Sequence, residues 1–257
     1  MDEKRPVYSK RNYNEKDCCV FRKTKEKYGG LSNMASGFPL KINSLHIYSS
    51  EALYQACRFP HLPDVQKVIL EQKSPMTAKM KSKPYRIQTR EDWEQVKIKI
   101  MQWCLRVKLA QNFLKFGLVL EETYFKPIVE DSSKDDFWGA KRQKGEKNIL
   151  IGVNALGRLL MELREKYFSE DRYKLLVVEP LLLNNFILLN EPIPTIDERD
   201  NLIVQIKGEQ DSNYNSNKIK SDDNIIREPT NKKKRKKSEK INKRNKQGDN
   251  SISLFND

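Results

Sequence analysis

Apolar residues recur along the chain with two different spacings, one typical of helices and one typical of strands. Over residues 92–115 apolar side chains recur at spacings of three and four, which predicts one long helix with a continuous apolar stripe. A leucine stripe predicts a second helix over residues 152–168. Residues 38–50 alternate with a period of two and predict a hairpin that turns at Asn43-Ser44. The stripe of the long helix is expected to pack in the core: Trp93, Val96, Ile100, Trp103, Val107, Ala110 and Leu114.

Shorter signals complete the expected order of elements. The stretch "SSEALYQACRF" predicts a helix that begins at Ser49 or Ser50, because serine is a favourable N-cap. "LPDVQKVILEQ" and "SPMTAKMKSK" predict two short helices, each with an early proline, and "KPIVE" predicts a strand. Many helices with a few strands indicate an α+β fold that is mostly helical. We expect one domain over residues 18–194, flanked by a disordered N-terminus (1–17) and a disordered tail (195–257), where apolar periodicity stops.

The positive charge of the 257-residue chain is concentrated in that tail. Residues 231–246, "NKKKRKKSEKINKRNK", contain ten Lys or Arg and one Glu, and so carry nine of the fourteen net positive charges. Such a segment is either a solvated appendage or a sequence-independent anchor for nucleic acid. In a eukaryotic cell it would also serve as a nuclear localisation signal.

Other features of the composition narrow the chemistry. His46 and His61 are the two histidines, so a His-rich metal site and the usual Ser-His-Asp or Cys-His catalysis are not expected, and neither metal nor cofactor is predicted. The four cysteines show no CxxC spacing and are read as reduced thiols. No apolar run is long enough to cross a membrane and the N-terminus has no signal-peptide core, so the expected compartment is the cytoplasm, or the nucleus in a eukaryote.

Three polar stretches are candidates for a site. "SSEALYQACR" places Glu51, Tyr54, Gln55 and Arg58 on one helix face, at offsets of three, four and seven. "VEDSSKDDFWGA" sets four carboxylates beside two aromatic rings, and "YGGLSNM" has two glycines, a serine and an asparagine in a turn. A carboxylate beside aromatic rings gains a raised pKa, and paired carboxylates are the usual equipment for cleaving a glycosidic bond.

Each of these features also has a purely structural explanation. Glu51 suits the positive end of a helix dipole, and Asp135-Asp136 suit a turn or a cap. Glu51 and Arg58 also suit a surface ion pair of little energetic consequence. The glycine turn is not a phosphate loop, because it lacks both the Walker lysine spacing and a GxGxxG pattern.

Five motifs, taken in order, resemble the NADAR family, also called YbiA-like. The resemblance covers about residues 18–190 and implies a compact, mostly helical α+β fold and hydrolysis of an N-glycosidic bond. Some members cleave phosphoribosyl-amine intermediates of riboflavin synthesis, and others remove ADP-ribose from guanine in nucleic acid, in some cases as antitoxins of a guanine-modifying ADP-ribosyltransferase. The motifs are "YGGLSNMASGFPL", "SSEALYQACRFP", "REDWEQVKIKIMQWCLRVKL", "IVEDSSKDDFWGA" and "GVNALGRLLMELRE".

The residues of these motifs are more similar to those of the guanine-directed members than to those of the riboflavin-type members. Trp138-Gly139 is followed by "AKRQKGEKN", where riboflavin-type members have a glycine-rich stretch. Arg58 stands where many members have lysine, which keeps the charge and changes its geometry. Carried over by motif, the resemblance implies that Glu51 is an active-site carboxylate and that the same pocket is formed by Asp136, Trp138, Glu130, Ser32, Asn33, Trp93, Asn154 and Arg164.

The expected mechanism uses two carboxylates. Glu51 would orient and deprotonate water, while Asp136 stabilises the cationic sugar or protonates the leaving amine. Trp138 or Trp93 would stack on a base. In an alternative covalent route, Lys23 attacks a ring-opened sugar to form a Schiff base. The candidates for contacting the pyrophosphate are Arg164, Lys141 and Arg142.

The expected partners follow from this interpretation. The substrate is ADP-ribosylated nucleic acid, the tail adds a second contact to nucleic acid, and a cognate ADP-ribosyltransferase toxin is a further candidate partner. Three alternatives stay open at this point: hydrolysis of a phosphoribosylamino-pyrimidine, non-catalytic binding of ADP-ribose, and binding of nucleic acid chiefly through the tail.

Overall fold

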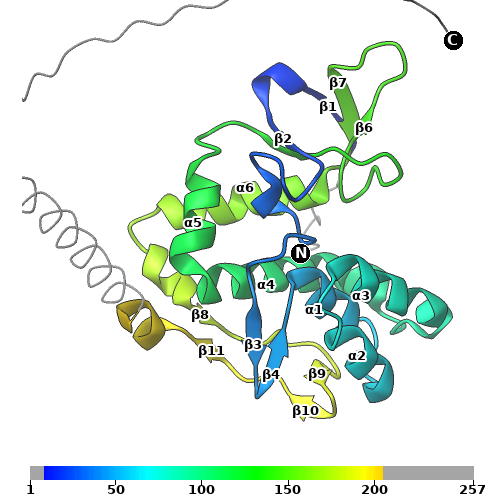
Figure 1. Cartoon of the computed structure of the whole chain (residues 1–257), viewed down its shortest axis with the longest axis vertical. Helices are drawn as coiled ribbons and strands as arrows, with labels where there is room; N and C mark the ends of the chain where they lie inside the picture. Colours follow the sequence, from blue (N-terminus) through cyan, green and yellow to red (C-terminus); the bar gives the residue numbers. More distant parts are fainter. Residues whose placement is uncertain (1–8, 205–257) are drawn as a thin grey trace, which may run out of the picture. The chain divides into compact units, whose positions relative to one another are not determined.

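The computed structural model describes residues 9–204 and confirms a mixed α+β fold (Figure 1). Helix α4 (Trp93–Gln111) crosses the middle of the molecule and buries six of the seven predicted stripe residues; the seventh, Leu114, is half-buried and lies in the next helix. Helices α1 (Ser50–Ala56), α2 (Pro63–Leu70) and α3 (Pro75–Ser82) pack against one another, and α1 also packs on α4. These short helices begin where the sequence predicts: the Ser49 hydroxyl accepts a hydrogen bond from the Ala52 amide, and Pro63 and Pro75 occupy first turns.

A second group of helices lies on another side of α4 (Figure 1). It consists of α5 (Phe113–Glu121) and α6 (Ala155–Phe168), and α6 also packs on strand β5 (Ile128–Glu130). A Cβ atom at Gly117 of α5 would lie 2.2 Å from the Tyr167 hydroxyl oxygen, so the two helices approach closely only because this residue is glycine.

Within residues 9–204 the strands are short and form five small sheets. The three-stranded sheet has the order β1 (Arg11–Asn14), β7 (Ile149–Gly152), β6 (Lys141–Arg142) and is antiparallel. Strand β2 (Cys19–Phe21) pairs in parallel with β5, with Phe21 opposite Glu130. The other pairs are antiparallel: β3 (Leu40–Ile42) with β4 (Leu45–Ile47), β8 (Val177–Val178) with β11 (Ile196–Asp197), and β9 (Ile187–Leu188) with β10 (Glu191–Pro192).

The predicted hairpin is confirmed, whereas the predicted long helix is divided. Asn43 occupies the hairpin turn with a left-handed φ of 53°. Helix α4 ends before Asn112, whose backbone leaves the helical region at φ −131° and ψ 44°, and α5 begins at the next residue. The Asn112 side chain donates 3.1 Å hydrogen bonds to the carbonyls of Lys108 and Pro39. The apolar period continues through this break, so it could not reveal the change in backbone direction.

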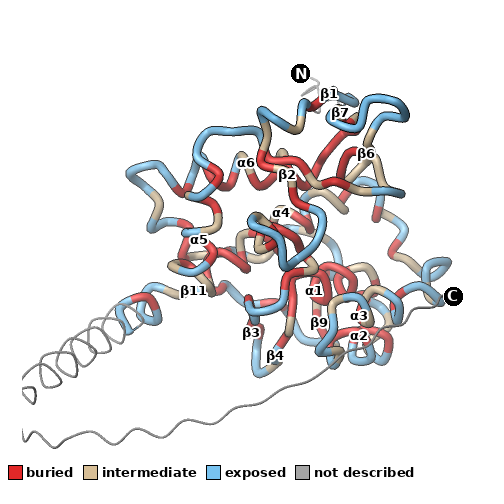
Figure 2. Tube along the Cα trace, turned by 45° about the horizontal axis from the view of Figure 1, so that its top comes forward, coloured by how far each residue is buried: buried red, intermediate tan, exposed pale blue. Residues whose placement is uncertain are grey.

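Ordered structure extends past both predicted boundaries. Residues 11–14 form β1, and Tyr13 packs against the buried Val129 and Leu150. Beyond residue 194, Ile196 and Leu202 are buried in the main core. Figure 2 shows buried residues along the helices and strands, and exposed residues on many of the loops that connect them. The predicted disorder of residues 1–8 and 205–257, including the basic segment, concerns parts of the chain outside the described residues.

In the part of the chain that the structure describes, four 3-10 helices connect the other elements. The Asn14 side chain caps the first of them, since its oxygen accepts a hydrogen bond from the Lys16 amide. The second carries the glycine turn of "YGGLSNM". Their bounds are η1 (Glu15–Asp17), η2 (Gly29–Leu31), η3 (Lys83–Gln88) and η4 (Arg172–Leu176).

Candidate active site

The three candidate polar stretches meet around one cavity of about 200 Å³. Its wall is formed by helix α1, the turn after η2, the end of β5 and the loop that follows β5. A wider surface hollow of about 600 Å³ lies near Asp92, but there the Asp92 carboxylate is paired with Arg90. We place the candidate site in the smaller cavity, because two carboxylates, Glu51 and Glu130, line it together with Trp138. Its lining is Ser32, Asn33, Met34, Glu51, Tyr54, Gln55, Arg58, Lys79, Arg86, Met101, Glu130, Ser132, Asp135, Trp138 and Leu156.

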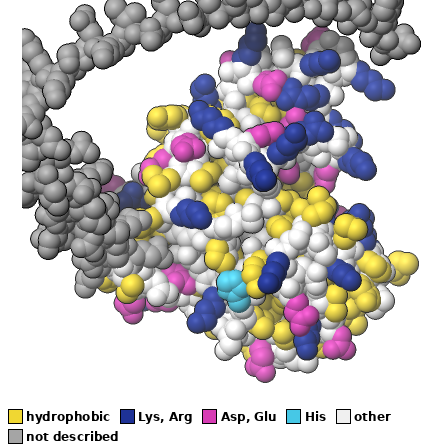
Figure 3. All heavy atoms as spheres, viewed as in Figure 1, with side chains coloured by type: hydrophobic (Ala, Val, Ile, Leu, Met, Phe, Trp, Pro, Cys, Tyr) yellow, Lys and Arg dark blue, Asp and Glu magenta, His cyan; other side chains and the backbone are white. Residues whose placement is uncertain are grey.

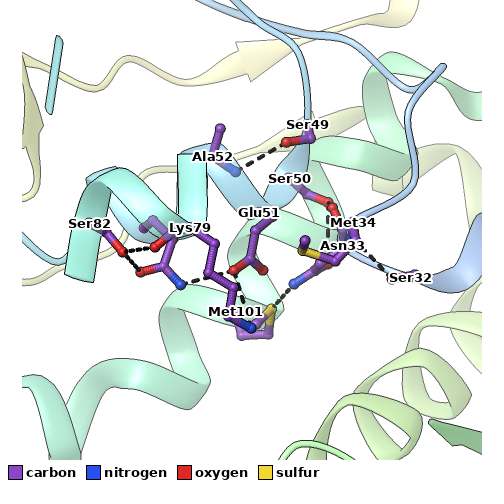
Figure 4. A network of polar contacts seen from close by, with 11 residues as sticks. Ser32, Asn33, Met34, Ser49, Ser50, Glu51, Ala52, Lys79, Ser82 and Met101 are labelled. Atoms are coloured by element: carbon purple, nitrogen blue, oxygen red, sulfur yellow. Dashed lines mark hydrogen bonds and ion pairs between the residues drawn. The ribbon is translucent and has the colours of Figure 1, made fainter. Parts of the chain in front are cut away.

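Glu51 lies at the centre of this cavity with only 5% of its surface exposed. Its Oε1 atom accepts a 2.9 Å hydrogen bond from Gln55 Nε2 and lies 3.8 Å from Lys79 Nζ (Figure 4). Gln55 is held in turn, because its Oε1 accepts a 2.9 Å hydrogen bond from the Ser82 hydroxyl. The carboxylate is therefore fixed by partners from α1 and α3, and a surface role for Glu51 is inconsistent with this burial.

The turn that carries Ser32 and Asn33 is bound to the start of α1. The Glu51 amide donates a 3.2 Å hydrogen bond to the Asn33 carbonyl, and the Ser50 hydroxyl donates one of 3.2 Å to Asn33 Oδ1. The Asn33 amide nitrogen donates to the sulfur of Met101 on α4, and the Ser32 hydroxyl accepts a 3.1 Å bond from the Met34 amide (Figure 4). Ser32 and Asn33 are nearly fully buried, so their position relative to Glu51 is rigid.

A buried lysine supports the same turn from behind. Lys108 of α4 is fully buried and donates hydrogen bonds of 2.6 Å and 3.1 Å to the carbonyls of Gly30 and Ser32. Its ammonium also lies over the rings of Phe38 and Phe116, at 4.5 Å and 4.1 Å from their centroids. Burial lowers the pKa of Lys108 well below its ordinary value. Sequence patterning gave no signal for this residue beyond its place in a helix.

Glu130 is the second carboxylate of the cavity. It ends β5, and the amide of Glu130 donates a 3.1 Å hydrogen bond to Asn154 Oδ1. Burial raises the pKa of Glu130 to about 7, with the negative charge of Glu51 as the next contribution. The raised pKa that the sequence led us to expect near this loop therefore belongs to Glu130.

The loop after β5 is shaped by its own side chains. Asp135 Oδ1 accepts hydrogen bonds of 3.0 Å and 2.9 Å from the amides of Phe137 and Trp138, which is the turn role considered for it. Trp138 is half-buried on the cavity wall and meets the Tyr54 ring edge-on, at 5.7 Å between centroids. A Cβ atom at Gly139 would lie 2.6 Å from the Glu130 carbonyl oxygen, so this glycine permits the loop to close onto β5.

Arg58 and Trp93 form a stacked pair behind the other end of α1. The guanidinium carbon of Arg58 lies 4.4 Å from the Trp93 ring centroid, and Trp93 also contacts Tyr54 at 5.1 Å between centroids. Arg58 lines the cavity, whereas Trp93 does not. Trp93 therefore supports the wall and is not positioned to stack on a substrate base.

Several residues expected in the pocket lie elsewhere. The Asp136 carboxylate pairs with Lys10 at 2.8 Å and lies 3.7 Å from Lys141, outside the cavity lining. Arg164 is buried and donates to Thr123 Oγ1 at 2.9 Å and to the Lys126 carbonyl at 2.7 Å, so it fastens the end of α5. Burial is the main cause that lowers the pKa of Arg164.

Asn154 and Arg142 also have structural partners. Asn154 is fully buried with a left-handed φ of 52°, and its side chain donates to the Ile128 carbonyl at 2.8 Å and accepts from the Glu130 amide. It thus holds the strand that presents Glu130. Arg142 binds Glu15 with both terminal nitrogens at 2.7 Å and Asp131 at 2.7 Å.

Lys23 lines a neighbouring hollow of about 540 Å³ together with Arg142 and Asp131. Its side chain is exposed, and it follows β2 by two residues. The pairing of β2 with β5 ends at Phe21 and Glu130, so Lys23 lies beyond the paired residues, and it does not line the candidate cavity.

Sequence reasoning missed three polar residues of the cavity: Lys79, Arg86 and Ser132. Lys79 and Arg86 come from α3 and η3, two basic stretches in which no single residue stands out. Packing of α3 against α1 brings Lys79 to Glu51, and this contact has no counterpart in local spacing.

The chain is similar in sequence to several known proteins. The N-glycosidase YbiA of Escherichia coli (strain K12) is 33% identical over 153 residues, covering 58% of this chain and 88% of the relative. The chloroplastic riboflavin biosynthesis protein PYRR of Arabidopsis thaliana is 42% identical over 82 residues, covering 32% of this chain and 12% of that protein. The NMR structure of E. coli YbiA has a TM-score of 0.49 at 32% identity, covering 58% of this chain and 84% of that chain.

Two further findings concern membrane-spanning helices and the protein family. No helix among residues 9–204 is long and apolar enough to cross a membrane. The model of the NADAR domain matches residues 20–167, which include every residue of the candidate cavity. The chain therefore belongs to the NADAR family.

Proposed function

We propose that the protein is an N-glycoside hydrolase that removes ADP-ribose from guanine bases of nucleic acid. The observation that carries this proposal is the pair of carboxylates, Glu51 and Glu130, in one small cavity beside Trp138. Cleavage of an N-glycosidic bond develops positive charge on the sugar and requires an activated water and a protonated leaving group. Two carboxylates in different environments supply both needs. The name of the E. coli relative, N-glycosidase YbiA, supports the same reaction type.

We assign different catalytic roles to Glu51 and Glu130. Glu51 is held by Gln55 and faces the Lys79 ammonium, which complements a negative charge, so we assign it the orientation and deprotonation of water. Glu130, with its pKa raised to about 7, is protonated in a substantial fraction of molecules near neutral pH. We assign it protonation of the leaving amine, in place of the Asp136 expected from sequence, because Asp136 lies outside the cavity and is engaged by Lys10.

A covalent route remains a second candidate for the same cleavage. Lys23 lines the neighbouring hollow with Asp131, which lies in the sequence between Glu130 and Ser132 of the cavity. The neutral amine of Lys23 would attack C1 of the ring-opened sugar and displace the guanine amine to form a Schiff base, which water then hydrolyses. Sodium borohydride reduces such an adduct to a stable amine. Reduction during turnover, followed by peptide mass spectrometry, separates the routes: an adduct at Lys23 establishes the covalent one, and its absence with full turnover supports attack by water.

Nucleic acid as the carrier of the substrate is supported by the surface charge. Figure 3 shows Lys and Arg side chains gathered at the end of the molecule that carries β1, β6 and β7. Exposed cations of this end include Lys10, Arg11, Lys16, Lys144 and Lys147. The basic segment 231–246 would add affinity that is independent of sequence. A cognate ADP-ribosyltransferase that makes the modified guanine is proposed as the functional counterpart.

Two other functions are distinguished by one experiment. The Arabidopsis relative is named for riboflavin biosynthesis, which favours a phosphoribosylamino-pyrimidine as the second candidate substrate. The purified chain is incubated with an oligonucleotide carrying ADP-ribosylated guanine and, separately, with ribosylaminouracil phosphate, and both are followed by mass spectrometry. Release of ADP-ribose from the oligonucleotide is the expected result. Cleavage of the small phosphate alone would assign metabolite hydrolysis, and binding without product would assign an ADP-ribose reader.

A further inference from the structure

Helix α1 and the residues that follow it give the candidate cavity two groups of opposite charge. Glu51 lies in its first turn, and Arg58 lies two residues past its last residue, Ala56. The helical rise from Glu51 to Ala56 is about 7.5 Å. Glu51, Glu130 and Arg58 all line the cavity, and the backbone of Arg58 is displaced from that of Glu51 by the length of α1.

Arg58 is held in place without a carboxylate partner among the described residues. Its guanidinium stacks on Trp93, and its Nε atom is buried with no hydrogen-bond partner within residues 9–204. Burial is the main cause that lowers the pKa of Arg58, and the like charge of Arg86 lowers it further. A guanidinium kept in a half-buried wall without a counter-ion is costly unless an anion arrives there.

Arg86 is the second guanidinium that lines the cavity. It belongs to η3 and lines the cavity with an exposed side chain, and no ion pair within the described part of the chain involves it. The segment after η3 is tied to Arg58 itself, because the Arg90 amide donates a 3.0 Å hydrogen bond to the Arg58 carbonyl. The backbone thus holds two like charges near each other.

We propose that Arg58 and Arg86 form a phosphate-binding subsite of the cavity, which takes the phosphate of a phosphorylated ribosyl group. This proposal rests on the proposed function, because it assigns the far end of the same substrate. Paired guanidiniums suit phosphate oxygens, since each offers several donors in a fixed plane. The sugar would then span the cavity with its anomeric carbon at Glu51 and Glu130. This subsite replaces Arg164, Lys141 and Arg142, which lie outside the cavity.

Ligand binding tests the subsite independently of turnover. Titration calorimetry measures the affinity of ADP-ribose, ribose 5-phosphate and adenosine for the Arg58→Gln and Arg86→Gln variants. Each loss of a charge-assisted contact should lower the affinity for the phosphorylated ligands about tenfold or more. The affinity for adenosine should change by less than about twofold. Arg199→Gln, an exposed arginine outside the cavity lining, is the matched control. Circular dichroism and Arg58→Lys, which keeps the charge, show whether a loss at Arg58 is only misfolding.

The outcomes are distinct. A loss for both phosphorylated ligands supports a shared phosphate subsite, and a loss for ADP-ribose alone assigns the subsite to a diphosphate. Unchanged affinity for both ligands in folded Arg86→Gln and Arg58→Gln proteins overturns the proposal. Intact phosphate binding with no cleavage of either substrate would refute the proposed hydrolase while leaving the subsite standing.

Discussion

Gln55 Nε2 donates a 2.9 Å hydrogen bond to Oε1 of Glu51, one helical turn earlier on α1. The side-chain amide of Gln55 cannot flip freely, because its oxygen accepts a hydrogen bond from the Ser82 hydroxyl. The chain Ser82, Gln55, Glu51 therefore fixes the orientation of the carboxylate that we assign to water activation. Glu51 itself is buried, so its direction in the cavity depends on these partners.

Removal of the Gln55 amide should lower turnover and leave the fold intact. Gln55→Ala deletes one hydrogen bond to a charged group, which corresponds to about a tenfold to hundredfold loss in kcat. KM should change less, because Gln55 acts through Glu51. Steady-state kinetics measures both constants, with Gln95→Ala on the exposed face of α4 as the control. An unchanged kcat in Gln55→Ala would show that Glu51 needs no such orientation.

Activity should fall as the pH rises above about 7. Glu130 has a raised pKa, so its protonated, proton-donating form is lost over that range. The measurement is kcat/KM between about pH 5 and pH 9. Glu130→Gln cannot donate a proton in the same way and should lose both most of the activity and the alkaline decline. Persistence of that decline in Glu130→Gln would assign it to another group.

The same residue makes stability depend on pH. The pKa of Glu130 lies at about 7 in the folded protein and at 4.5 without the fold, so between these values the folded state holds a proton that the unfolded state has released. The contribution of Glu130 to the free energy of unfolding is therefore lost as the pH rises from about 4.5 to about 7, by at most roughly 3 kcal/mol. Urea unfolding of wild type and Glu130→Gln at the two ends of this range measures the difference. Equal pH dependence of the two proteins would contradict it.

Lys108 should matter for both stability and activity. Lys108→Met leaves the Gly30 carbonyl without its lysine donor and releases the turn that carries Ser32 and Asn33. We expect the free energy of unfolding to fall by about 1–3 kcal/mol and kcat to fall with it. Lys115→Met removes another lysine that binds a carbonyl, that of Gly37, on an exposed surface and is the control. Equal effects of the two variants on kcat would argue against a role for Lys108 in the site.

The extent of the fold determines how the basic tail should be tested. Ile196 and Leu202 belong to the core, so a deletion must begin after residue 204. Removal of residues 205–257 should weaken DNA binding and reduce its dependence on salt, because the deleted part includes the ten cations of residues 231–246. Hydrolysis of a short modified oligonucleotide should stay nearly unchanged. A comparable loss of hydrolysis would show that the tail contributes to catalysis.

The sequence predicted what depends on local periodicity. Helical spacing placed Glu51, Tyr54, Gln55 and Arg58 on one face, and the structure places all four on the wall of one cavity. Local periodicity could not predict contacts between segments that are distant in the sequence. Lys79 reaches Glu51 only because α3 packs on α1, and Glu130 rather than Asp136 faces the cavity because Asn154 holds the end of β5. Tyr13 orders an N-terminal strand whose composition alone indicated disorder.

The most direct test of the account compares wild type with Glu51→Gln in the release of ADP-ribose from an oligonucleotide carrying ADP-ribosylated guanine. The account predicts release by wild type, loss of turnover in Glu51→Gln with an unchanged circular dichroism spectrum, and full activity in Glu94→Gln, an exposed carboxylate of α4. Wild-type turnover by Glu51→Gln would contradict the assignment of this cavity as the catalytic site.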